Sequence, residues 1–203
     1  MRYASAGAFR RALETRLAAQ ARETGRSIVR LRKEVAFDRL LARLFAVAPD
    51  GWVLKGALAL DYRFGDRART TKDIDLSNTR DEASATNELL AAQAVDLGDF
   101  FGFAIDRTSA LDRLMEGSAA RYHVRAELAG RGFDDFLLDV GFDPPTGAEL
   151  DPLRGPDLLG FADIAPAEVP AAPIEFREAP CLHPRHGAGS VGSTPSRTSW
   201  TWR

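Results

Sequence analysis

Apolar residues recur at helical spacing near the beginning of the chain. Residues 8–24 and 27–47 are predicted to form two helices, and in the second of them Ile28 and Leu31 begin a series of apolar positions three or four residues apart. Ser27 is a suitable N-cap for that second helix. The first quarter of the chain is therefore expected to be helical.

Short apolar runs between turn residues predict strands further along. The run from Trp52 to Leu54 is followed by a Gly and a helix-forming stretch, and Asp81 begins another predicted helix that ends near Leu97. Gly130-Arg131-Gly132 is a hairpin signal. The other expected elements are strands at 72–77, 100–108, on both sides of that turn within 121–145, and at 174–178, with a loop over 146–173. This order predicts a mixed α/β fold with a small, partly antiparallel sheet.

Composition excludes several classes of protein. No apolar run approaches the roughly 20 residues that a membrane span requires. Cys181 is the only cysteine, so neither a disulfide framework nor a zinc cluster is expected. The charged N-terminus has no apolar signal-peptide core, and we expect a cytoplasmic protein without a membrane partner.

Charge is distributed unevenly. Residues 1–43 hold 11 Lys and Arg against 4 acids, a balance of +7, whereas residues 44–182 hold 13 against 25, a balance of −12. A basic N-terminal section could bind a polyanion such as nucleic acid. A solvated helix face with ordinary ion pairs is the alternative, and charge alone favours it.

Two carboxylates stand two positions apart in TTKDIDL, residues 70–76. Because strand side chains alternate, Asp73 and Asp75 should share one face and Ile74 and Leu76 the other. Like charges on one face stay ionised beside a cation or in water. Hard oxygen ligands at this spacing suit Mg²⁺ with substrate phosphates. The alternative is two solvated acids on an edge strand.

Two further features bear on this site. Asp139 lies among apolar strand residues in FLLDVGF, where a metal shared with the first two acids would give it a partner. A solvated strand end is the alternative. Gly56, in LKGALAL, stands between a predicted strand and a predicted helix, where phosphate could approach backbone N–H groups. A tight turn would explain the same Gly.

These residues together resemble the AbiEii toxin family of nucleotidyltransferases, which includes the MenT toxins and has a polymerase-β-type fold. The resemblance rests on LKGALALDYRFGDRARTTKDIDLS, 54–77, and on FLLDVGF, 136–142, and extends over residues 50–180. The family pattern, a Gly with a second small residue, then Thr or Ser-x-Asp-x-Asp, then an acid on a later strand, is matched at Gly56, Asp73 to Asp75 and Asp139. Ala57 departs mildly from the usual Gly or Ser.

The resemblance implies the chemistry of the site. Asp73 and Asp75 would hold Mg²⁺ on a nucleoside triphosphate (NTP), and Asp139 would help to hold a second ion near the acceptor hydroxyl. Some relatives add nucleotides to tRNA 3′ ends and are restrained by a cognate antitoxin. A small-molecule nucleotidyltransferase of the same fold is an alternative. Expected nucleotide-binding residues, with ordinary surface or local roles as the alternative for several of them, are Lys55, Gly56, Ala57, Arg67, Arg69 and Thr71.

The end of the chain departs from the family pattern. We expect an N-terminal helical section at 1–48, a nucleotidyltransferase core at 49–182 and a disordered or aberrant tail at 183–203. The tail lacks Asp, Glu, Lys and Leu, so it cannot form a helix with an apolar face. A frameshifted reading of helices that relatives carry is our hypothesis, and a natural flexible tail is the alternative. In the frameshifted case the chain would be a weak enzyme or an impaired remnant.

Overall fold

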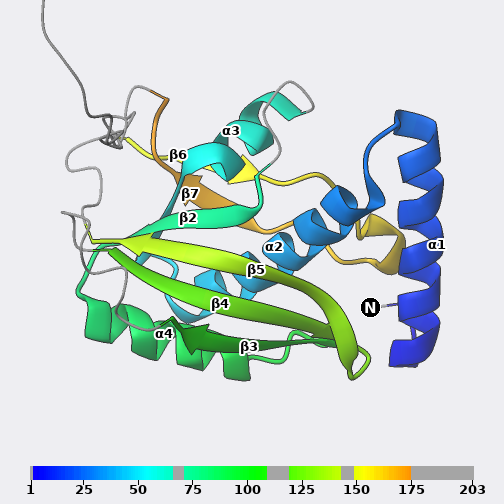
Figure 1. Ribbon diagram of the computed structural model, residues 1–203, viewed down its shortest axis with the longest axis horizontal. Helices are drawn as coiled ribbons and strands as arrows, with labels where there is room; N and C mark the ends of the chain where they lie inside the picture. The colour runs from blue at the N-terminus through cyan, green and yellow to red at the C-terminus, as the bar shows by residue number, and fades with distance from the viewer. Residues whose placement is uncertain (1, 66–70, 109–118, 143–148, 175–203) are drawn as a thin grey trace, which may run out of the picture.

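The computed structural model describes residues 2–65, 71–108, 119–142 and 149–174 (Figure 1). The predicted mixed α/β fold is confirmed, because four α-helices accompany one seven-stranded mixed sheet within this part of the chain. The helices are α1 (Ala6–Thr24), α2 (Ile28–Val47), α3 (Gly56–Phe64) and α4 (Glu82–Ala94). The strands are β1 (Trp52–Lys55), β2 (Asp73–Asn78), β3 (Phe101–Arg107), β4 (Ala119–Leu128), β5 (Arg131–Gly141), β6 (Asp151–Arg154) and β7 (Glu168–Ala171).

The helix ends follow from local chemistry. Ser5 accepts a hydrogen bond from the Ala8 amide and caps the start of α1, and Gly25, in the left-handed region, caps its end after Thr24. Asp81 caps α4 in the same way through the Ser84 amide. The predicted end of α4 near Leu97 is too late, because the chain becomes extended directly after Ala94.

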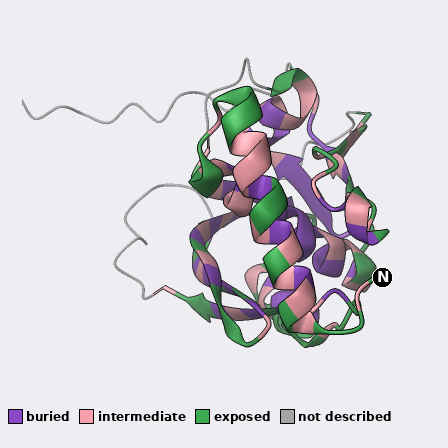
Figure 2. Ribbon diagram, turned by 90° about the vertical axis from the view of Figure 1, so that its right-hand side faces the viewer, coloured by how far each residue is buried: buried purple, intermediate pink, exposed green. Residues whose placement is uncertain are grey.

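The sheet has the strand order β3-β4-β5-β2-β1-β7-β6. β2 runs parallel to β5, and β1 runs antiparallel to β2. In Figure 1, α2 and α4 lie behind the sheet and α1 stands beside it. One hydrophobic cluster joins the buried residues of α1, α2, α4 and the sheet. Figure 2, viewed from the side of α1, shows exposed and half-buried residues along that helix above a buried interior.

The prediction of a loop over 146–173 is wrong. The described part of this range contains β6, β7 and the short 3₁₀ helix η3 (Gly160–Ala162) between them. Pro152 and Pro170 stand opposite each other in these two strands and conceal the strand pattern. β7 continues the sheet by pairing with β1 at Leu54 and Ala171.

Two sequence predictions fall mainly outside the described residues. The strand expected at 174–178 is described only at Ile174, which lies in a turn. The tail at 183–203 lies outside the described residues altogether. Among the residues that the structure does describe, no helix is both long enough and apolar enough to cross a membrane.

A buried ion pair joins α2 to the segment between α4 and β3. Arg43 and Asp99 have side chains that are 0% and 2% exposed, and the Arg43 Nη1 donates to Asp99 Oδ2 at 3.0 Å. The remaining donors of the same guanidinium reach the backbone oxygens of Arg39, Val95 and Phe101. Because every polar group of this arginine has a partner, its charge is accommodated in the interior.

Asp99→Asn is therefore expected to leave the Arg43 charge buried without a counter-ion. We expect the free energy of unfolding to fall by about 3 kcal/mol, measured by urea denaturation. Asp50→Asn removes the same charge at an exposed position and should change stability by less than about 0.5 kcal/mol. Equal effects of the two substitutions would contradict this assignment.

Candidate functional site

Three aspartates share one face of the sheet. Asp75 of β2 stands directly beside Asp139 of β5, and Asp73 stands beside Leu137. Paired residues of adjacent strands point to the same face, and Asp73 and Asp75 share a face because strand side chains alternate. Ile74, Leu76 and Leu138 form the opposite, buried face. The fold thus places on one face of the sheet the three carboxylates that the sequence singled out, with Asp75 and Asp139 directly adjacent.

The carboxylates are not arranged as a finished metal site. Across the described residues, no group of three or more His, Cys, Asp or Glu side chains is placed to hold a metal ion. Asp139 is instead bound by Arg121 of β4, whose Nε and Nη2 lie 2.6 and 2.8 Å from the two carboxylate oxygens. Arg121 was not among the predicted site residues, because only the pairing of β4 with β5 brings it beside an acid.

Gly56 brings the beginning of α3 against Asp75. Its φ is +65°, a conformation that L side chains rarely adopt. A Cβ added to Gly56 would lie 2.0 Å from Oδ2 and 2.9 Å from Cβ of Asp75. Only a glycine therefore permits this approach, which sets the N-terminus of α3, including Ala57, beside the aspartate face.

Lys55 adds a cation to the same face. It is the antiparallel partner of Asp75, and its side chain extends across β2 toward β5. A Cβ built on Gly141 of β5 would lie 3.2 Å from the Lys55 Nζ. The acids therefore have basic side chains on both sides, Lys55 from β1 and Arg121 from β4.

The remaining predicted site residues are placed as follows. The Thr71 hydroxyl donates to the Asp73 carbonyl at 2.8 Å and accepts from the Asp73 amide at 3.3 Å. This is the local role that the sequence analysis left open beside a phosphate contact. Arg67 and Arg69 lie outside the described residues.

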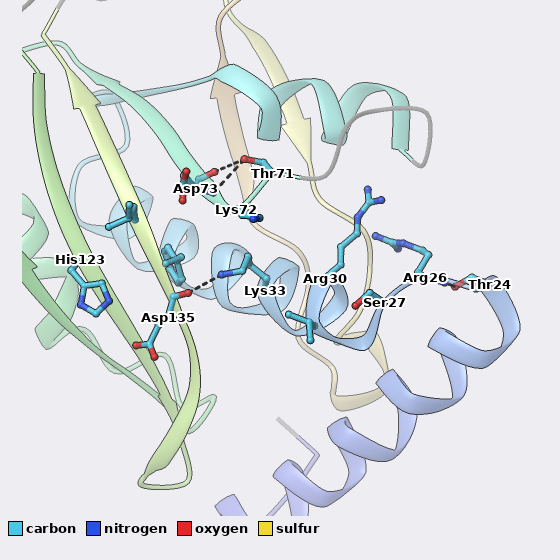
Figure 3. A pocket seen from close by; sticks show the side chains of 14 residues that line it. Thr24, Arg26, Ser27, Arg30, Lys33, Thr71, Lys72, Asp73, His123 and Asp135 are labelled. Atoms are coloured by element: carbon cyan, nitrogen blue, oxygen red, sulfur yellow. Dashed lines mark hydrogen bonds between the residues drawn. The ribbon is translucent and has the colours of Figure 1, made fainter. Parts of the chain in front are cut away.

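A pocket of about 870 Å³ opens beside Asp73 (Figure 3). It lies between β5, the beginning of β2 and the corner where α1 meets α2 (Figure 3). Val29, Phe136 and Leu137 supply apolar surface to its lining. Its polar lining, apart from Asp73, consists of Thr24, Arg26, Ser27, Arg30, Lys33, Thr71, Lys72, His123 and Asp135. The sequence signal for three of these cations was the basic balance of the first 43 residues, which did not locate a pocket.

The basic corner of this pocket consists of Arg26, Arg30 and Lys33, and acidic residues hold it in position. Arg26 and Arg30 both bind Glu34, and Arg30 Nη2 also lies 2.7 Å from Asp61 Oδ1. Burial raises the pKa of the Glu34 carboxyl, while the two arginines act in the opposite direction. Lys33 Nζ lies 2.9 Å from Asp134 Oδ1. The corner is thus held in position, and its positive charge is partly offset from behind.

Comparison with known proteins gives a family and a distant structural likeness. The model of a family described as "Nucleotidyl transferase AbiEii toxin, Type IV TA system" matches residues 39–176. The solved structure "Crystal structure of JHP933 from Helicobacter pylori" is 19% identical, with 72% of this chain and 53% of that chain covered and a TM-score of 0.43. A second, "Crystal structure of putative nucleotidyltransferase from H. pylori", is 19% identical, with 71% and 54% covered and a TM-score of 0.41.

This chain spans about half the length of those two solved structures. The comparison with curated proteins gives no match.

Gly56→Ala tests how closely α3 must approach Asp75. The added methyl group would collide with Asp75 near its backbone, and the left-handed φ adds strain of its own. We expect urea denaturation to show a loss of about 3 kcal/mol, combining left-handed strain with overpacking.

Gly98→Ala is the matched control. Gly98 also has a positive φ, +67°, but an added Cβ would meet nothing within 4 Å. This variant should lose only the strain, about 1 kcal/mol. If both variants lost the same stability, the collision with Asp75 would have no consequence, and the tight approach would be refuted.

Proposed function

The chain belongs to the AbiEii nucleotidyltransferase toxin family of type IV toxin–antitoxin systems, and from this membership we propose that it transfers a nucleotide from an NTP to a nucleic-acid acceptor. The observation that carries the proposal is the pairing of Asp75 with Asp139, with Gly56 against Asp75. Acids, a Gly at a helix N-terminus and flanking cations are the components that phosphoryl chemistry needs.

Divalent-cation binding is part of this proposal. Carboxylate oxygens are the ligands that Mg²⁺ prefers, and the Asp75 carboxylate lies directly against Gly56 at the start of α3. Mg²⁺ would be held by Asp73, Asp75 and Asp139. The ion would supply charge neutralisation for the triphosphate.

The chain's own groups have separate tasks in the transfer. The acceptor hydroxyl oxygen bonds to the α-phosphorus, the bond from that phosphorus to its bridging oxygen breaks, pyrophosphate leaves, and the hydroxyl proton is lost to solvent. The amides of Gly56 and Ala57 at the start of α3 would bind phosphate oxygens. Lys55, Arg67 and Arg69 would offset the charge of the leaving group, and Thr71 would hold Asp73 in place.

The pocket beside Asp73 is the place we propose for the acceptor end. Its apolar residues Val29 and Leu137 suit the face of a base, and Lys72 and the basic corner suit phosphates. A tRNA 3′ end combines both features, and the basic N-terminal section is consistent with a nucleic acid as the acceptor. A cognate antitoxin is the proposed protein partner, on family grounds.

Asp73→Asn and Asp75→Asn are each expected to reduce nucleotide transfer by on the order of 10³, because several kcal/mol of charge stabilisation are lost. The assay follows incorporation of each of the four α-³²P-labelled NTPs into tRNA in the presence of Mg²⁺. A parallel reaction with small-molecule acceptors and no RNA tests the small-molecule alternative.

Asp106→Asn is the control for these variants. Asp106 is an exposed acid of β3 that pairs with Arg125, at the far edge of the sheet from β2. Its removal should leave the rate within about twofold, since exposed pairs contribute little. Transfer that survives both aspartate substitutions would rule out the proposed acidic site.

A further inference from the structure

Arg121 reaches Asp139 because of an irregularity in the β4–β5 hairpin. Next to the turn, Leu128 pairs with Arg131 and Glu127 with Gly132, and a register shift of one residue follows between Ala126 and Glu127. A regular hairpin would set position 121 opposite position 138, since each pair near the turn sums to 259. The shift sets Arg121 opposite Asp139 instead, on the same face of the sheet.

The resulting contact occupies both oxygens of the carboxylate. Arg121 Nε lies 2.6 Å from Oδ1 and Nη2 lies 2.8 Å from Oδ2 of Asp139, a two-point contact that is the strongest form of this pairing. The two side chains are 42% and 29% exposed. Solvent and a dissolved cation can therefore reach the pair, and neither side chain is locked in the interior.

The guanidinium opposes a divalent cation at the acids in two ways. It uses the oxygens that would bind the cation, and its own positive charge repels that cation at short range. Asp75 and Asp139 stand side by side, and Arg121 already pairs with one of these two acids.

We propose that Arg121 keeps Asp139 paired until a divalent cation arrives with the nucleotide. The displaced guanidinium then binds a substrate phosphate, which compensates for the lost pair. Cation binding and nucleotide binding are thereby coupled. A cation alone must compete with Arg121 for Asp139. A cation carried by a triphosphate brings a phosphate group to which the displaced Arg121 can bind. This inference rests on the proposed function.

The first half of this inference, that Arg121 opposes cation binding at Asp139, is tested with Mn²⁺ alone. Free Mn²⁺ is titrated by electron paramagnetic resonance against the full chain and its R121Q, R121K and R125Q variants, without nucleotide. R121Q should bind Mn²⁺ about three- to fivefold more tightly, the upper end of the scale for one exposed charge pair. R121K keeps the charge without the two-point contact and should lie between R121Q and the unmodified chain.

R125Q is the matched control. Arg125 is four residues along β4 on the same face and pairs with Asp106 at 2.8 Å, with no acid of β2 beside it. The R125Q substitution removes the same charge from the same strand, so the Mn²⁺ affinity of this variant should stay within about twofold of the unmodified chain.

The second half is tested with a non-hydrolysable NTP analogue. With saturating Mn²⁺, R121Q should bind the analogue about tenfold more weakly than the R125Q control, because one charge-assisted phosphate contact is lost. A merely structural Arg121 would instead lower stability in urea denaturation and leave both affinities unchanged. Unchanged Mn²⁺ affinity in folded R121Q, or in folded R121K if R121Q does not fold, overturns the inference.

The outcomes separate this inference from the proposed function. If the unmodified chain binds Mn²⁺ no better than Asp75→Asn does, the acidic site itself is wrong. If Mn²⁺ binding depends on Asp75 but is the same in R121Q and R125Q, the acidic site stands and only the role of Arg121 fails.

Discussion

Three carboxylates on one face of two adjacent strands repel one another, and the rest of the site responds to that constraint. The parallel pairing of β2 with β5 fixes Asp75 beside Asp139, so the strands cannot relieve the repulsion by moving apart. Lys55 and Arg121 come from the flanking strands and stand beside the acids. The site is thus balanced by its own cations, and these same cations are suited to bind phosphates when a metal takes their place.

The opposite face of the sheet gives the acids a fixed platform. Ile74, Leu76 and Leu138 are buried beneath them, and α2 crosses behind the sheet (Figure 1). The buried Arg43–Asp99 pair ties α2 to the segment before β3. From the beginning of α2, the basic corner reaches the pocket beside Asp73. Packing on one face therefore determines which charges meet on the other.

The sequence predicted the local elements of the site better than the relations between them. Alternation in KDIDLS and FLLDVGF was enough to place Asp73, Asp75 and Asp139 on strand faces, and the Gly before α3 was recognisable. The strands β6 and β7 were missed because Pro152 and Pro170 conceal them. Arg121 could not be found, because its position opposite Asp139 depends on a one-residue shift in the hairpin. A bulge of this kind changes which residues stand opposite each other over the rest of the hairpin, and the alternation of apolar and polar residues does not reveal it.

The central claim is that the aspartate face, which the pairing of β2 with β5 forms, binds a divalent cation. Thermal unfolding in increasing MnCl₂ measures this directly, because a ligand that binds only the folded state stabilises it by about 2.7 kcal/mol at one hundred times its dissociation constant. We predict that the unfolding temperature rises steadily with Mn²⁺ concentration and that the rise is abolished in Asp75→Asn but not in Asp106→Asn. An unfolding temperature that does not respond to Mn²⁺, or that rises equally in Asp75→Asn, would contradict the account.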